Sequence, residues 1–310
     1  MNYTRHKIPS SKEEWKKDRL NGIGGSDAAA AIGMSPWKSP YTLWCEKMGL
    51  ISNDSDNEAM RLGRDLEDYV AERFTEATGK KVRKTSYSFQ SFNHPFMLAN
   101  VDRLIVGEDA GLECKTTSAL TKTKYDKGDI PIQYYIQCMH YMAVTGKKKW
   151  YIAILVLGIS FHWFEVKWDD DEIQNLISKE QEFWDLVIQK KEPSMDGSES
   201  TIETIKELYP ESDHSHIDLF DKDALLDRYM ELRSYIKQMD NEKCQIENII
   251  KNEMENCEYA HTERFTIKWK NYQSNRVDTK LLQSEFPDVY AAVLKESKGR
   301  RFEIKEVTVE

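Results

Sequence analysis

Two carboxylates and a lysine occupy positions from which they could meet on one face of a β-hairpin. Asp102 lies in an apolar segment that predicts a strand, and Glu113 and Lys115 lie two residues apart in the next predicted strand. If Val106 faces Gly111 across the intervening turn, Asp102 lies opposite Lys115 and diagonal to Glu113. The three side chains then share one face of the sheet.

This set of side chains suits metal-assisted hydrolysis of a phosphodiester. Carboxylate oxygens are preferred ligands of Mg²⁺ and Mn²⁺. A nearby lysine can help to position or deprotonate the attacking water, and the metal can neutralise charge on the phosphate. Asp102 interrupts a largely apolar run, where an unpaired carboxylate is costly, so a charged partner or a metal ion is expected. A solvated set of cross-strand charges is the alternative, because this spacing is common by chance.

Two predicted helices carry further polar side chains that could join the hairpin. Glu67 borders the apolar face of a helix predicted over residues 58–77. Gln137 and Tyr141 lie four residues apart and share a face of a helix predicted over residues 133–144. The edge of an amphipathic helix and a polar helix face are the ordinary interpretations, and the neighbouring carboxylates favour a site.

A glycine-rich loop near the start of the chain could receive a phosphate. Residues 22–25 precede a helix predicted over residues 26–32, with Ser26 as its cap. Backbone N–H groups at the start of a helix bind anions such as phosphate. The guanidinium of Arg19 could donate two hydrogen bonds to the same phosphate. An ordinary capped helix after a flexible loop is the competing interpretation.

The surrounding segments predict an α/β fold, a restriction-endonuclease-like mixed sheet flanked by helices. Hydrophobic periodicity separates strands from helices along the chain. The predicted elements are strands at 86–92, 96–106 and 112–116, a hairpin of 150–157 with 160–167, and helices at 41–48 and 169–191.

The last third of the chain differs in character. We expect a nuclease domain over residues 1–193, a linker over 194–221 and an accessory region over 222–310. Three- and four-residue steps predict a coiled-coil-like helix, followed by a small α/β unit with alternating segments at 265–269 and 302–309. The stepped residues are Leu225, Tyr229, Leu232, Ile236, Met239, Ile246 and Ile250, with Lys243 interrupting the series.

Composition narrows the class of protein. The net charge is −9, but basic groups outnumber acidic ones in residues 1–150 and 261–305, and contact with DNA needs only a local basic groove. The five cysteines are scattered, so neither a zinc site nor a disulfide framework is expected. With no membrane span and no secretion signal to be read, a cytoplasmic protein is expected.

At these residues the chain resembles a YqaJ-type viral recombinase, the family that includes lambda exonuclease. The resemblance covers about residues 15–190 and consists of pieces that match in order. They are Arg19 with Ile23-Gly24-Gly25-Ser26-Asp27 and Ser35-Pro36-Trp37, Gly63 with Glu67, Asp102, Glu113-Cys114-Lys115, and Gln137 with Tyr141 and Val144-Thr145-Gly146. The chain departs from the family's PD-(D/E)xK motif at one place, because Val101 precedes Asp102 where the motif name has proline before aspartate.

The resemblance implies a PD-(D/E)xK core that hydrolyses phosphodiesters with two Mg²⁺ ions, for which Mn²⁺ would substitute. It implies digestion of double-stranded DNA from the 5′ end, leaving a 3′ strand for a single-strand annealing protein. It also implies a homo-oligomer, as a ring trimer or tetramer. If the chain is phage- or prophage-encoded, its place is the bacterial host cytoplasm.

The resemblance also assigns roles to the residues. Metal ligands would be Glu67, Asp102, Glu113 and the backbone carbonyl of Cys114. Lys115 would act on the attacking water, with Gln137 and Tyr141 in support, and Arg19 and Ser26 would hold the 5′ phosphate.

Two other functions compete with this interpretation. An endonuclease or repair nuclease would share the metal site and would need no pocket for a 5′ phosphate. A non-catalytic DNA-binding scaffold would keep the fold and lose catalytic groups, whereas the carboxylates and lysine are all present here.

Overall fold

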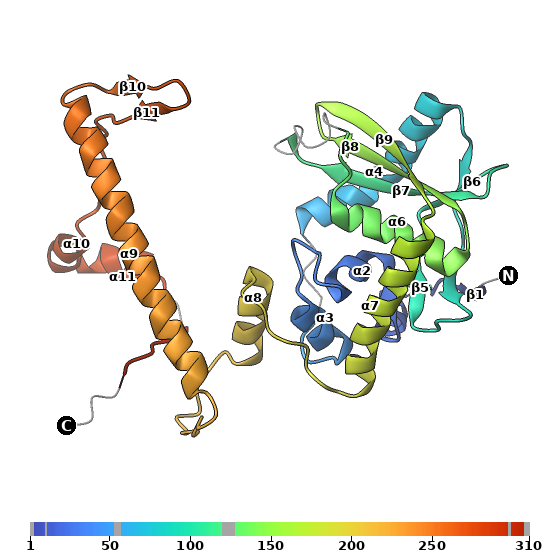
Figure 1. Cartoon of the computed structure of the whole chain (residues 1–310), viewed down its shortest axis with the longest axis horizontal. Helices are drawn as coiled ribbons and strands as arrows, with labels where there is room; N and C mark the ends of the chain where they lie inside the picture. The colour runs from blue at the N-terminus through green and yellow to red at the C-terminus, as the bar shows by residue number, and fades with distance from the viewer. Residues whose placement is uncertain (1–2, 10, 53–56, 120–127, 297–298, 307–310) are drawn as a thin grey trace. The chain divides into compact units, whose positions relative to one another are not determined.

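The computed structural model describes residues 3–9, 11–52, 57–119, 128–296 and 299–306. The chain divides into two compact units, Met1–Pro210 and Glu211–Glu310, and Figure 1 shows the elements of each. Within the described residues, none of the helices is both long and apolar enough to cross a bilayer.

A five-stranded mixed sheet forms the centre of the first unit, as the sequence predicted. The strand order is β3-β6-β7-β8-β9, and only β7 and β8 run parallel. Parallel neighbours need a crossover connection, and the helix α6 (Ile132–Thr145) supplies it. The strands are β3 (Val82–Arg83), β6 (Arg103–Ile105), β7 (Ala110–Thr117), β8 (Lys149–Val156) and β9 (Ser160–Lys167).

Helices cover both faces of this sheet because β8 is apolar on both faces. Tyr151 and Ala153 pack with Val70 and Phe74 of α4 (Glu58–Thr78). The alternate residues Trp150, Ile152 and Ile154 belong to the larger core, which includes residues of α6. Successive side chains of a strand point to opposite faces, so a continuous apolar run places a helix on each side.

The strand predicted over residues 96–106 is wrong as a single element. Its first half is β5 (Met97–Ala99), which joins a separate sheet of order β1-β4-β5-β2, and its second half is β6 in the central sheet. Residues 100–102 connect the two sheets. An apolar run shows that a segment is buried but not which neighbour it pairs with. The other strands of this sheet are β1 (Tyr3–Lys7), β2 (Ile23–Gly24) and β4 (Tyr87–Ser91).

A short helix near the start of the chain packs against α6. After α1 (Lys12–Leu20), the helix α2 (Gly25–Ala31) buries a run of alanines whose small side chains let it approach α6 closely. The predicted cap by Ser26 is wrong, because Gly24 is the N-cap and no side chain caps this helix. The helices α3 (Pro40–Lys47) and α7 (Asp170–Ile188) complete the layer.

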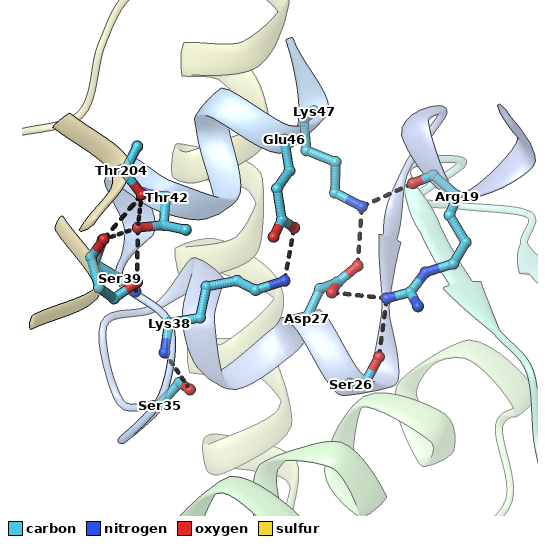
Figure 2. A network of polar contacts seen from close by, with 11 residues as sticks. Arg19, Ser26, Asp27, Ser35, Lys38, Ser39, Thr42, Glu46, Lys47 and Thr204 are labelled. Carbon is cyan, nitrogen blue, oxygen red and sulfur yellow. Dashed lines mark hydrogen bonds and ion pairs between the residues drawn. The ribbon is translucent and has the colours of Figure 1, made fainter. Parts of the chain in front are cut away.

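The segment predicted as a linker over 194–221 contains a helix, α8 (Glu199–Leu208). Thr204 of α8 and Thr42 of α3 form a buried hydrogen bond between their hydroxyls at 2.8 Å (Figure 2). The Thr201 hydroxyl donates to the Ser39 hydroxyl, also at 2.8 Å. These contacts make α8 part of the first unit.

The second unit is dominated by α9 (Asp223–Met254), which confirms a helix in this region. A short hairpin follows, of β10 (Tyr259–His261) and β11 (Thr266–Lys268), and then α10 (Thr279–Glu285) and α11 (Pro287–Val293). The strand predicted at 302–309 is absent from residues 302–306, and its remainder lies outside the described residues.

Candidate active site

The hairpin of β6 and β7 has a different register from the predicted one. Arg103 pairs with Leu112 and Leu104 with Gly111, whereas we expected Val106 opposite Gly111. The shift is two residues, so the set of residues on each face is unchanged. Asp102 therefore lies beside Glu113 and Cys114 instead of opposite Lys115.

Asp102 is held in place by the neighbouring strand. Its Oδ2 accepts a hydrogen bond from the backbone N–H of Cys114 at 2.8 Å. Burial raises the pKa of Asp102 well above its usual range, and the negative charge of Glu113 adds to the rise. Two carboxylates of like charge, one half-buried and one buried, favour binding a cation or a proton.

Glu113 is the centre of the polar network. Its Oε1 accepts from Lys115 Nζ at 2.5 Å and from Gln137 Nε2 at 2.7 Å. Its Oε2 is buried, and no donor among the described residues reaches it. A buried carboxylate oxygen without a partner is costly, and a metal ion would satisfy it.

Lys115 holds a proton in this arrangement. Burial lowers its pKa, but the negative charges of Glu113 and Asp102 outweigh that effect and raise it overall. A protonated lysine can orient a water molecule or stabilise a phosphate, but it cannot accept a proton. Positioning and deprotonation of the attacking water, the two roles considered from the sequence, both stay predictions.

Gln137 and Tyr141 extend the network along α6. Gln137 Nε2 donates to the Tyr141 hydroxyl at 2.8 Å, and that hydroxyl donates to the Asn100 carbonyl at 3.0 Å. Burial raises the pKa of Tyr141 well above its usual range. The structure thus brings together Asp102, Glu113, Lys115, Gln137 and Tyr141, all of which the sequence nominated.

Glu67 does not join the other carboxylates directly. Its Oε1 accepts from Nη1 of Arg103 at 2.5 Å, and Nη2 of Arg103 binds Asp68 at 2.5 Å. Within the described part of the chain, no group of three His, Cys, Asp or Glu side chains could hold a metal ion. Glu67 is near enough for its charge to raise the pKa of Asp102.

Arg103 was missed by sequence reasoning. Its side chain is only 3% exposed, and it pairs with two acidic residues of α4, Glu67 and Asp68. A charged residue inside the apolar run of residues 98–106 was the available signal, because a buried guanidinium needs an anionic partner.

The donor set at the hairpin fits a hard divalent cation. Asp102 and Glu113 offer carboxylate oxygens, and Oε2 of Glu113 is buried without a donor among the described residues. The negative charge of Glu113 also raises the pKa of Asp102. Mg²⁺ and Mn²⁺ prefer such ligands.

A second polar cluster lies at the start of α2 (Figure 2). Arg19 Nη2 donates to the Ser26 hydroxyl at 3.1 Å and to Asp27 Oδ1 at 2.9 Å. Asp27 Oδ2 accepts from Lys47 Nζ at 2.9 Å. The structure therefore brings Arg19 and Ser26 together as predicted, and it adds Asp27, the residue after Ser26, and Lys47, which comes from α3.

The two clusters meet where α2 crosses α6. A side-chain carbon built on Gly25 would lie 2.4 Å from a ring carbon of Tyr141. This close approach fixes the start of α2 against the residue that supports Gln137 and Glu113. The separation between the clusters is therefore set by backbone packing.

Comparison with known proteins places the chain in context. A model of the YqaJ-like viral recombinase domain matches residues 14–148, a range that contains every nominated site residue. The uncharacterized protein YqaJ of Bacillus subtilis (strain 168) is 41% identical over 304 residues, which cover 96% of this chain and 95% of that protein.

Among solved structures, the alkaline exonuclease LHK-Exo from Laribacter hongkongensis has a similar fold. The TM-score is 0.51 at 20% identity, covering 58% of this chain and 94% of that one. The same enzyme in complex with dAMP gives a TM-score of 0.51 at 20% identity over 63% of this chain and 96% of that one.

Proposed function

The chain belongs to the family of YqaJ-like viral recombinase domains, and from this premise we propose that it is a metal-dependent deoxyribonuclease. The observation that carries the proposal is the pair of half-buried Asp102 and buried Glu113, with Lys115 on one oxygen of Glu113 and the other oxygen lacking a donor among the described residues. A purely structural ion pair would not need the second carboxylate.

Asp102, Glu113 and the backbone carbonyl of Cys114 would hold Mg²⁺, or Mn²⁺ in its place. Glu67, now paired with Arg103, is the further carboxylate available for a second ion. A bound ion would neutralise charge on the phosphate and lower the pKa of an attacking water.

The chain's own residues then have separate tasks. Lys115, protonated and bound to Glu113, orients the water and stabilises negative charge near the scissile phosphate. Gln137 fixes the Glu113 carboxylate through its amide, and Tyr141 holds that amide in place.

The finer proposal is digestion of duplex DNA from a 5′ end, which leaves a 3′ single strand. Arg19 and Ser26 lie together beside the backbone of Gly25, which contacts Tyr141 of the metal-site network. A terminal phosphate bound there would be held at a fixed separation from the hairpin. The similar fold of an alkaline exonuclease supports the exonuclease part of this proposal.

Partners follow from the same proposal. The 3′ strand would pass to a single-strand annealing protein. By resemblance to its family, the chain would act as a homo-oligomer, a ring trimer or tetramer.

One assay separates this function from an endonuclease or a repair nuclease. Linear duplexes with a 5′ phosphate, a 5′ hydroxyl or a blocked 5′ end, and closed circular DNA, are incubated with and without Mg²⁺. We expect Mg²⁺-dependent digestion of linear DNA, fastest with the 5′ phosphate, and an intact circle. Nicking of the circle would favour the endonuclease, and binding without cleavage of any substrate would favour a scaffold.

A further inference from the structure

Asp27 connects two cationic side chains at the site proposed for the 5′ phosphate. Its carboxylate is 3% exposed and accepts from Arg19 on one oxygen and from Lys47 on the other, both at 2.9 Å. Burial would raise the pKa of Asp27, but the charges of Lys47 and Arg19 hold it well below its usual range. The carboxylate is therefore ionised and shared between two cations.

Lys47 belongs to α3 and contacts the backbone of Arg19 as well as the carboxylate of Asp27. Its ammonium donates to the Arg19 backbone carbonyl at 2.7 Å as well as to Asp27. The Lys47 side chain is 4% exposed, whereas that of Arg19 is 27% exposed. Arg19 is thus held at its backbone by Lys47 and at its guanidinium by Asp27, with part of its side chain open to solvent.

The charges of the three side chains do not cancel. If Asp27 bound Arg19 alone, the carboxylate would neutralise the guanidinium and weaken its attraction for a phosphate. Lys47 shares the carboxylate, so positive charge remains at the exposed member of the cluster. Burying a lysine is costly, and structural pairing of Asp27 with Arg19 alone would not require it.

We propose that Lys47 and Asp27 are positioning residues for the 5′-phosphate pocket, which orient Arg19 and keep its positive charge available. This inference rests on the proposed function of Arg19. The contacts that carry it are all drawn in Figure 2.

The test measures kcat and KM of the full chain on duplexes that differ only in a 5′ phosphate or 5′ hydroxyl. In Lys47→Met we expect KM for the phosphorylated duplex to rise about ten-fold, because a charge-assisted contact is weakened. The preference for phosphate over hydroxyl then falls toward one. Lys47→Gln, which keeps a donor but no charge, is the milder variant should Lys47→Met fold poorly, and it should show the same loss.

Lys38→Met is the matched control. Lys38 lies in the same network but pairs with Glu46 at 2.6 Å instead of Arg19, so this variant should keep the preference. Equal digestion of both duplexes by the wild type would refute recognition of the 5′ phosphate, and this proposal with it. A wild type that discriminates, with lysine variants that discriminate equally well, overturns the role of Lys47 alone.

A second and independent observation concerns α9. One face of this helix, called the seam here, consists of residues spaced alternately by four and three positions. They are Leu225, Tyr229, Leu232, Ile236, Met239, Lys243, Ile246 and Ile250. In the described structure this seam is exposed or half-buried along its whole length. A seam of this spacing pairs with another helix of the same period.

The charges beside the seam decide how two copies of α9 could pair. In a parallel pair, Arg228 would face Arg233 of the other copy and Glu242 would face Glu247. Two copies of Lys243 would also meet within the seam. Parallel self-pairing is therefore opposed by like charges at three places.

An antiparallel pair removes these conflicts. In an antiparallel pair centred between Ile236 and Met239, Arg233 of each copy lies beside Asp240 of the other copy. The two Lys243 side chains are then far apart. Asp240 also pairs with Lys243 of its own helix at 3.2 Å. We infer that the seam of α9 binds a second copy of this chain in antiparallel orientation, however the first unit assembles.

Charge exchange tests this pairing in the full chain by sedimentation equilibrium at several concentrations. Arg233→Glu and Asp240→Arg should each weaken self-association about ten-fold or more, and the double variant should restore it. Lys237→Glu, on the side of the helix away from the seam, should leave it unchanged. Stronger association of Arg233→Glu would indicate a parallel pair, and an unchanged association constant would show that α9 does not bind its copy; either result overturns the inference.

Discussion

At Glu113, one oxygen accepts from Lys115 and Gln137 while the other has no donor among the described residues. We predict that Asp102→Asn or Glu113→Gln lowers the rate of DNA cleavage by about three orders of magnitude or more, because electrostatic groups at such a centre each contribute several kcal/mol. The midpoint of thermal unfolding should hold or rise in Asp102→Asn, because the change removes the like-charge neighbour of Glu113 and leaves the Lys115–Glu113 pair in place. Single-turnover cleavage and calorimetry on the same preparations provide the check. Wild-type rates in Asp102→Asn would end the proposal.

A buried His140–Glu180 pair gives a prediction at the same scale. His140 Nδ1 lies 2.8 Å from Glu180 Oε1, and its Nε2 lies 2.9 Å from the Leu98 carbonyl. Burial lowers the pKa of His140, but the charge of Glu180 and both hydrogen bonds, with a smaller contribution from the charge of Asp27, raise it above 6.5 overall. A raised pKa means that this contribution to stability is full below pH 6.5 and is lost as the pH rises through the folded pKa.

We therefore expect the free energy of unfolding to fall as the pH is raised from about 6.5, by ~1.4 kcal/mol for each unit by which the folded pKa exceeds the unfolded one. His140→Gln should unfold with a flatter pH dependence between pH 6 and 9, measured by denaturant titration. Glu180→Gln should flatten it equally, since the histidine loses its counter-charge. A slope identical to the wild type in both variants would show that His140 stays neutral throughout.

The site residues that could be predicted from the sequence are those whose sequence neighbours differ in character from them. Asp102 was visible because a carboxylate interrupts an apolar run, and Glu113 and Lys115 because they follow in the next strand. Lys47 and Asp27 were hidden because each looks like an ordinary helix residue, and their meaning depends on a contact between α2 and α3. A charge that is buried by tertiary packing carries no local signal.

At the scale of elements, the crossing of α2 and α6 positions both polar clusters. We predict that Gly25→Ala destabilises the fold by about 1–3 kcal/mol, the usual cost of overpacking, because the new carbon would lie 2.4 Å from the Tyr141 ring. Cleavage should fall as well, since Tyr141 holds Gln137 and through it Glu113. Gly24→Ala is the matched control, because its carbon would meet only Asp27 Oδ2 at 3.7 Å. Equal stability and cleavage rates in the two variants would contradict the close contact.

Helices with a strong apolar period were predictable, and elements defined by pairing were not. The helix predicted over residues 58–77 is α4, and that over 133–144 is α6, each within one residue at its ends. The helix α8 was missed because its buried residues are Thr201 and Thr204, while Ile202 and Ile205 are exposed. A periodicity search follows isoleucines, so it cannot detect a helix that packs through hydroxyl groups.

At the scale of the whole molecule, the boundary between the units sets where the chain can be shortened. All nominated site residues lie in Met1–Pro210, and α8 belongs to that unit through its contacts with Ser39 and Thr42. A chain that ends after residue 193 loses these contacts, whereas one that ends after residue 210 keeps them.

We predict that the protein of residues 1–210 folds and cleaves linear DNA at a rate close to that of the full chain. The protein of residues 1–193 should unfold several degrees lower, because the Ser39 and Thr42 hydroxyls lose their partners in α8 and each such hydrogen bond contributes about 0.5–1.5 kcal/mol. If the second unit grips DNA, the 1–210 protein should bind duplex more weakly, with a shallower dependence on salt, because each lost phosphate contact reduces that slope. If α9 instead joins copies of the chain, sedimentation should show a smaller particle at unchanged salt dependence. Differential scanning calorimetry, filter binding across salt concentrations and sedimentation distinguish these outcomes, and equal unfolding midpoints for the 1–193 and 1–210 proteins would contradict the docking of α8.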